Sequence, residues 1–149
     1  MTAFTIEIEE RAVVDALNRL AAAAGDLTPA MRAIATALQS QTEDNFAAES
    51  GPLGKWSALK DKKRQGGKIL QDTGRLAASV TPFWSAAEAG IGSNAVYAAI
   101  HQIGGKAGRG LKATIPPRPY LPAFPDGRLQ VGMEDEIVDV IQTHLLGAG

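Results

Sequence analysis

Two stretches in the first third of the chain carry apolar residues at helical spacing. In residues 13–24 they recur every three or four positions on one helical face, and Gly25 ends the pattern. A second stripe runs through residues 27–49. Asp26 or Thr28 is its expected N-terminal cap, because either side chain can accept a free backbone N–H bond. The spacing predicts two amphipathic helices that form much of the core.

The later segments alternate between extended and helical patterns. Pro82 removes a backbone donor, so the strand that contains it is expected at a sheet edge. The predicted elements are a strand at 4–9, a helical turn at 72–80, a β-hairpin at 80–92, a short helix at 95–103, an extended stretch at 113–122 and a final helix at about 131–146.

These elements predict an α+β fold within a single domain, residues 1–149. Two N-terminal helices, one short central helix and one C-terminal helix would pack on a small, mainly antiparallel sheet. Clusters of Gly, Pro and Lys predict long mobile loops at about 50–68 and 104–114. The chain has no cysteine, which excludes disulfides and thiolate catalysis. No apolar run reaches the roughly 20 residues that a membrane-spanning helix needs.

Charge is distributed unevenly along the chain. Residues 55–118 hold eleven of the fifteen Lys and Arg residues but only three acids, whereas residues 1–54 and 119–149 are acidic. Such a split favours contact with a partner of opposite charge. The partner could be another protein, including a second copy of this chain, or nucleic acid bound by the basic loops 60–68 and 106–112. The candidate contact residues in these loops are Lys60, Lys62, Lys63, Arg64, Lys68, Lys106, Arg109 and Lys112.

The sequence offers no set of residues suited to catalysis or to a cofactor. Gly66-Gly67-Lys68 lacks both the first glycine and the hydroxyl residue of a phosphate-binding loop. His101 and His144 have no ligand-spaced partner, so no metal site is expected. Ser79 or Ser93 could join His101 in a catalytic set, but no Gly-x-Ser-x-Gly turn accompanies either serine. We therefore expect a protein that is not an enzyme.

The second half of the chain holds four recognisable motifs. They are Ile69-Leu70-Gln71-Asp72-Thr73-Gly74-Arg75-Leu76-Ala77-Ala78-Ser79, Ile91-Gly92-Ser93-Asn94, Val96-Tyr97-Ala98-Ala99-Ile100-His101-Gln102-Ile103-Gly104-Gly105 and Ile115-Pro116-Pro117-Arg118-Pro119-Tyr120-Leu121. In their order and spacing these motifs resemble the phage virion morphogenesis (tail completion) family of Mu-like and P2-like phages and prophages, and the resemblance covers nearly the whole chain. Ile103, Tyr120 and Pro117 depart from the family pattern only by apolar exchanges.

The resemblance implies a structural protein at the head–tail junction of a virion, which completes the tail or joins it to the head. It implies a ring, commonly of six subunits, that assembles in the host cytoplasm. The implied partners are tail tube or terminator proteins and head connector proteins, with DNA in the lumen as a non-specific neighbour and no membrane. No catalytic residue is implied.

Within the motifs we separate contact residues from structural ones. Arg118 and Tyr120, on the proline-rich arm, are expected to contact another subunit, so replacing both by Ala should harm assembly more than folding. Tyr97 and His101 are expected to pack and to form hydrogen bonds within the short helix. The full set of structural motif residues is Trp56, Thr73, Gly74, Leu76, Tyr97, His101, Gln102, Gly104, Gly105 and Pro119.

Overall fold

The chain combines helices and short β-hairpins, in the α+β class that the sequence predicts. The computed structural model describes residues 11–56, 75–93, 98, 102, 105–107, 110, 113–115, 117–124, 126 and 128–148. Its helices there are α1 (Arg11–Ala24), α2 (Thr28–Ala48), α3 (Arg75–Ser79) and α5 (Met133–Ala148). Its strands are β1 (Ser50–Gly51), β2 (Gly54–Lys55), β3 (Thr81–Trp84), β4 (Ala89–Gly92), β5 (Gly105–Ala107) and β6 (Ala113–Ile115).

The first two helices lie where the apolar spacing predicts them. Gly25 adopts a φ of 74°, which permits the turn between them. The predicted cap of α2 is wrong in one respect, because the residue at the N-cap position is Leu27 and its side chain makes no capping bond. Asp26 acts one residue earlier, where its carboxylate accepts the backbone N–H of Thr28 at 3.0 Å. This bond lowers the pKa of the exposed Asp26 carboxyl.

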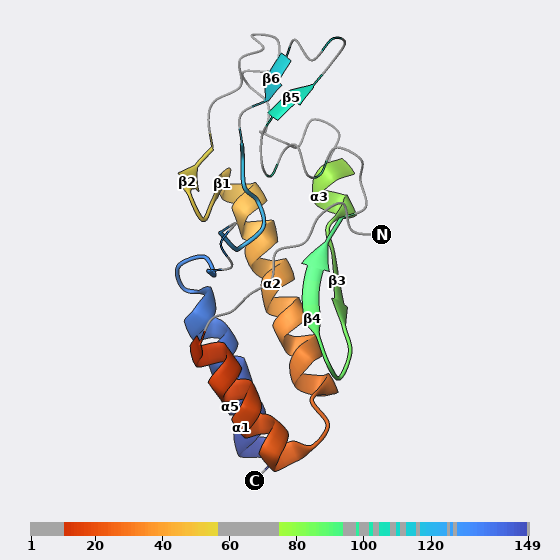
Figure 1. Ribbon diagram of the computed structural model, residues 1–149, viewed down its shortest axis with the longest axis vertical. Coiled ribbons are helices and arrows are strands. Elements are labelled where there is room, and N and C mark those ends of the chain that lie inside the picture. Colours follow the sequence, from red (N-terminus) through yellow and green to blue (C-terminus); the bar gives the residue numbers. More distant parts are fainter. Residues whose placement is uncertain are drawn as a thin grey trace.

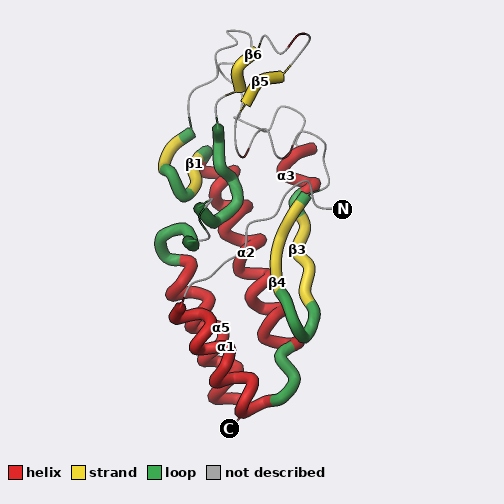
Figure 2. Tube along the Cα trace, viewed as in Figure 1, coloured by secondary structure: helices red, strands yellow, loops and turns green. Residues whose placement is uncertain are grey.

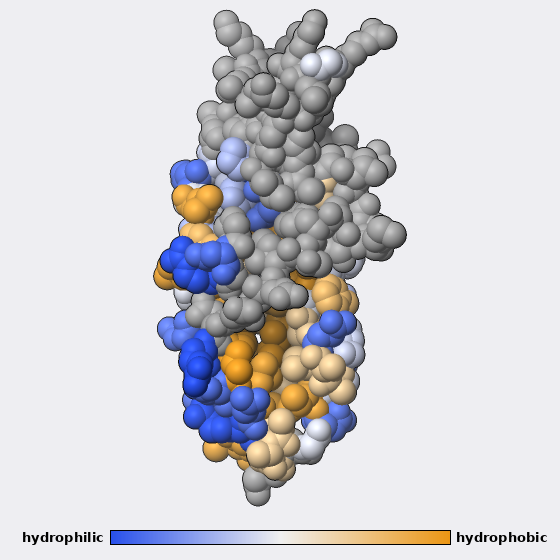
Figure 3. All heavy atoms as spheres, viewed as in Figure 1, coloured by the Kyte–Doolittle hydropathy of each residue, from blue (hydrophilic) through white to orange (hydrophobic). Residues whose placement is uncertain are grey.

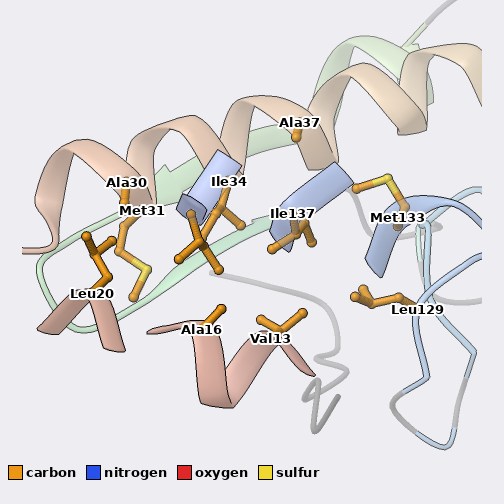
Figure 4. Packing of buried hydrophobic residues seen from close by; sticks show 11 residues of the cluster. Val13, Ala16, Leu20, Ala30, Met31, Ile34, Ala37, Leu129, Met133 and Ile137 are labelled. Carbon is orange, nitrogen blue, oxygen red and sulfur yellow. The ribbon is translucent and has the colours of Figure 1, made fainter. Parts of the chain in front are cut away.

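The body has three layers, with α2 in the middle (Figure 1). Helices α1 and α5 lie side by side on one side of α2, and the β3–β4 hairpin lies on the other side (Figure 2). Figure 4 shows Ala16 and Leu20 of α1 directed toward α2. In the space-filling view, apolar residues reach the surface between the helix pair and the hairpin (Figure 3). The buried members of this core are Val13, Ala16, Leu20, Ala30, Met31, Ile34, Ala37, Leu129, Met133, Ile137 and Ile141.

The described strands form three separate antiparallel pairs, β1–β2, β3–β4 and β5–β6. The predicted hairpin at 80–92 is confirmed, with Thr81 opposite Gly92 and Trp84 opposite Ala89. Two ranges that were predicted as loops contain strands, because β1–β2 lies within 50–68 and β5 lies within 104–114. The partner of β5, β6, lies at the start of the stretch 113–122 that was predicted to be extended. Backbone pairing forms these short strands, so the side-chain pattern gave little warning of them.

Some predicted elements lie wholly or partly outside the described residues. The strand at 4–9 and most of the loop at 50–68 are among these. Within the short helix predicted at 95–103, the structure describes Ala98 and Gln102, and both are helical.

Candidate functional site

The motif segments meet in a second buried cluster at the end of α2 that lies away from α1. Its members come from α2, the β1–β2 hairpin, α3 and the proline-rich arm, residues 117–121. The Phe46 ring is stacked on Tyr120 at 5.2 Å between centroids and meets Trp56 edge to face at 5.7 Å. Such aromatic pairs stabilise a core beyond the area that they bury. The buried residues of this motif junction are Phe46, Trp56, Leu76, Val80, Ala98 and Tyr120.

Trp56 joins the β1–β2 hairpin to the arm. Its indole Nε1 donates a hydrogen bond of 2.8 Å to the carbonyl oxygen of Pro119. Gly51 allows this approach, because a Cβ atom at that position would collide with the same carbonyl group. Trp56 and Pro119 are both buried, so their assignment as structural motif residues agrees with their positions.

Gln102 joins the central helical stretch to the arm. Its side-chain oxygen accepts the backbone N–H of Tyr120 at 2.9 Å and that of Leu121 at 3.1 Å. The Tyr120 hydroxyl donates to the carbonyl oxygen of Ala98 at 2.7 Å. The β5–β6 hairpin lies in the sequence between Gln102 and the arm. The motif junction therefore fixes the chain on both sides of this hairpin.

Burial makes the Tyr120 hydroxyl a neutral donor rather than an acid. Its side chain is 1% exposed, and this desolvation raises its pKa well above the usual value near 10. The group stays protonated and keeps its bond to Ala98 at every pH at which most proteins are stable. The hydroxyl group therefore serves to hold the arm against Ala98.

Asn45 is a buried polar member of the junction that the sequence analysis missed. Its Nδ2 donates to the Tyr120 carbonyl oxygen at 2.9 Å and to Gln130 Oε1 at 2.8 Å, while its Oδ1 accepts from Gln41 and Gln130. This amide therefore links α2, the arm and the segment before α5. The sequence does contain a signal that Asn45 is buried. It follows Met31 and Leu38 at intervals of seven residues, which places it on the buried face of α2.

The two arm residues proposed as subunit contacts lie inside the single chain. Arg118 is 7% exposed and Tyr120 is 1% exposed. The Tyr120 ring fills the space between Phe46 and Ala98, which leaves none of it to contact a neighbour. We revise the expectation for these residues accordingly: their replacement should harm folding at least as much as assembly.

The other predicted residues divide into described and undescribed ones. Leu76 is buried in the junction, and Gly105 pairs with Ile115 in the β5–β6 hairpin. Lys106 belongs to β5, where only its backbone is described. The predicted residues that lie outside the described part are Lys60, Lys62, Lys63, Arg64, Lys68, Thr73, Gly74, Tyr97, His101, Gly104, Arg109 and Lys112.

The side-chain hydrogen bonds of the described residues are either local, as that of Thr42 to Leu38 is, or connect distant segments, as that of Trp56 to Pro119 does. The hydroxyls of Ser79 and Ser93 lie 2.6 Å apart in a hydrogen bond, and His101, the third candidate for a catalytic set, is outside the described residues. In the described part of the chain, no group of three or more His, Cys, Asp or Glu residues is placed to hold a metal ion. Among the same residues, no helix is both long and apolar enough to cross a membrane.

Comparison with known proteins identifies related chains. The sequence profile of the phage virion morphogenesis family matches residues 8–146. The chain is 43% identical over 133 residues to Mu-like prophage FluMu G protein 2 of Haemophilus influenzae, an alignment that covers 87% of this chain and 92% of the relative. It is 37% identical over 128 residues to the putative capsid assembly protein G of Escherichia phage Mu, with 78% of each chain covered. No solved structure matches it significantly.

Proposed function

We propose, because this chain belongs to the phage virion morphogenesis family, that it is a structural subunit of the head–tail junction of a phage particle. In this role it completes the tail or joins the tail to the head. The family match over residues 8–146 is the observation that carries the proposal. The name of the phage Mu relative, a putative capsid assembly protein, also supports a part in building the particle.

The geometry of the motif junction supports a structural role without catalysis. Its polar side chains Trp56, Gln102 and Tyr120 form hydrogen bonds to backbone groups. These side chains hold the arm and the β5–β6 hairpin, and they are buried where no substrate could reach them. Side chains used in this way build a rigid support for a contact surface.

The proposed assembly is a ring, with six subunits as the working number. A ring needs two unlike faces on each subunit, so that one face binds the other face of the next copy. The acidic ends and the basic middle of the sequence provide charges of opposite sign for such contacts. Tail tube or terminator proteins and head connector proteins are the proposed partners, and the ring would assemble in the host cytoplasm before it enters the virion.

Electron microscopy of lysates from a phage that lacks this gene tests the proposed role. The expected result is intact filled heads and separate tails, with joined particles restored when the wild-type gene is supplied in trans. Joined, infectious particles in the absence of the gene would refute the role. Malformed or missing heads would also refute it, because they would show that the protein acts in capsid assembly before the junction forms.

A binding experiment separates the proposed partners from nucleic acid. The purified protein should cosediment with tails that lack it, and binding should weaken between 0.1 and 1 M salt because the screening length falls from about 10 Å to about 3 Å. Salt-sensitive binding to DNA without binding to tails or connectors would instead support the alternative, in which the protein binds nucleic acid through the basic loops 60–68 and 106–112.

A further inference from the structure

The strand that the sequence predicts at residues 4–9 lies outside the described residues. This segment alternates polar residues with the apolar Phe4, Ile6 and Ile8. Such alternation is typical of a strand with one buried face. A strand of this kind needs an edge that bonds its backbone and an apolar surface that its buried face can cover. The described part of the chain offers both at one place, beside β4.

The pairing of the β3–β4 hairpin determines which backbone groups point out of it. The Ser85 N–H donates to the Glu88 carbonyl oxygen at 2.8 Å, next to the turn. Hydrogen-bonded pairs and non-bonded pairs alternate along an antiparallel ladder. Phe83 and Gly90, which lie opposite each other two residues further along, are therefore the next pair that is bonded within the hairpin.

The two outer edges of the hairpin differ in what they can bond. The intervening pairs, Pro82 with Ile91 and Trp84 with Ala89, direct their backbone groups outward. Pro82 has no N–H, so the edge of β3 lacks a donor, which discourages the addition of another strand. The edge of β4 is complete, because Ala89 and Ile91 each offer a donor and an acceptor. No strand among the described residues pairs with this edge.

The edge of β4 also borders the apolar interior. Ala89 packs against the core between α1, α2 and α5, and Ile91 packs against the motif junction. Among the described members of these two clusters, none comes from β3, so β4 is the inner strand of the hairpin. All four residues of β4 are half-buried, and apolar residues lie at the surface between the hairpin and the helix pair (Figure 3). Backbone groups in such surroundings are costly to leave without a partner.

Residues 4–9 are within reach of this edge. The segment ends two positions before α1, and Val13, in the first turn of α1, belongs to the same core that Ala89 packs against. An extended chain advances about 3.3 Å per residue. Residues 4–9 are therefore long enough to run along the whole of β4, which has four residues.

We propose that residues 4–9 of this chain add to the free edge of β4 as a third strand beside the β3–β4 hairpin. The side chains of Phe4, Ile6 and Ile8 then lie on the same face as those of Ala89 and Ile91, which contact the two cores. The polar side chains of the segment point outward. The added strand satisfies the backbone of β4 and covers the apolar surface beside it.

This pairing has a consequence for association between copies. An open strand edge is a template on which the strand of another molecule can pair. Residues 4–9 close the one complete edge of the hairpin, and Pro82 protects the other. The hairpin is then not available for edge-to-edge pairing between subunits. The inference does not depend on the proposed place of the protein at the head–tail junction.

Amide hydrogen exchange of the purified full-length protein, followed residue by residue by NMR, tests the pairing. The amides of Ala89 and Ile91 should be protected, although no bond within the hairpin holds them. Gly90 is the internal reference, because its amide bonds to Phe83 across the hairpin. Tenfold dilution of the protein should leave these exchange rates unchanged, since the strand comes from the same chain.

A paired substitution shows whether the segment supplies the protection. Ile6→Ser together with Ile8→Ser removes two apolar side chains from the buried face. Exchange at Ala89 and Ile91 should accelerate by about tenfold or more, because burying one such side chain contributes a factor of roughly ten or more. Exchange at Gly90 should change much less.

The matched control places serine at the outward positions of the same segment. Thr5→Ser together with Glu7→Ser should leave exchange at Ala89 and Ile91 within about twofold of the wild type. Circular dichroism of both paired variants checks that they are folded.

Four results would overturn the inference. The first is fast exchange of Ala89 and Ile91 in the wild type, and the second is an equal effect of the inward and outward pairs or an equal acceleration at Gly90. The third is a loss of protection on dilution, which would show that a second copy supplies the strand. The fourth is protection of the Trp84 amide in place of Ala89, which would put the added strand on β3.

Discussion

The buried Asn45 amide provides a direct test of how the arm is held. Replacing Asn45 by Asp keeps the shape of the side chain but turns its donor group into an acceptor. In the wild type, Asn45 Nδ2 donates to the Tyr120 carbonyl oxygen at 2.9 Å and to Gln130 Oε1 at 2.8 Å. In the variant at neutral pH, a carboxylate oxygen faces these two acceptors instead. A buried acceptor that loses its donor costs about 1–3 kcal/mol. With two acceptors affected, we expect a loss of about 3–5 kcal/mol in the free energy of unfolding.

The pH dependence of this loss distinguishes the mechanism from general damage. Burial and the facing oxygens disfavour the ionised form, so the pKa of the new carboxyl is raised above its unfolded value of about 3.9. The folded state then binds more protons than the unfolded state between these two pKa values, and stability falls as pH rises through that window. Each unit of pKa shift adds about 1.4 kcal/mol to the loss above the folded pKa. The variant should therefore be closer to wild type at pH 4.5 than at pH 7.5.

Urea unfolding at the two pH values, followed by tryptophan fluorescence, measures this difference. Asp44→Asn is the matched control. The Asp44 side chain is exposed, so exchanging its carboxylate for an amide should change the free energy of unfolding by less than about 0.5 kcal/mol. The reasoning is refuted if Asn45→Asp costs no more than this control, or if its cost is the same at pH 4.5 and pH 7.5.

Two further substitutions test the junction. Tyr120→Phe removes the buried hydroxyl bond and should cost about 1 kcal/mol at pH 7. The raised pKa of Tyr120 makes the wild type lose stability as pH rises above about 10. The melting temperature of the variant should therefore fall less steeply than that of the wild type between pH 10 and 11.5. An identical fall would contradict this. Gly51→Ala should cost about 2–4 kcal/mol in chemical unfolding, because its methyl group meets the Pro119 carbonyl oxygen. Gly147→Ala, in a helical position with open space around it, should be neutral or slightly stabilising, and equal effects of the two exchanges would argue against this close approach.

The elements that could be predicted are those whose signal is local. The apolar periodicity of α1, α2 and α5 and the hairpin at 80–92 depend on residues within one segment, and each of these elements is present. The β5 strand, Gly105–Ala107, has no apolar alternation in its sequence. It is held by backbone pairing with β6. Its presence depends on a second segment, so the sequence around it indicated only a loop.

The candidate site was predicted as a set of segments but not as a geometry. Trp56, Gln102 and Pro119 were recognised as structural from their motifs, and they meet in the junction. Asn45 was missed because its partners lie 75 and 85 residues away. Tyr120 was expected to contact another subunit, but Phe46 and Ala98, which are distant in the sequence, enclose it. Long-range partners of this kind leave no local pattern.

The attachment of the arm has a mechanical consequence. Three side chains from different parts of the chain, Trp56, Gln102 and Asn45, bond to the backbone of residues 119–121. A pulling force applied to the end of β6 would travel along the chain to these bonds, which attach at three successive residues. The force would then pass through Asn45 into the 21 residues of α2, the longest helix described. The arm thus mechanically connects the β5–β6 hairpin to the helical body.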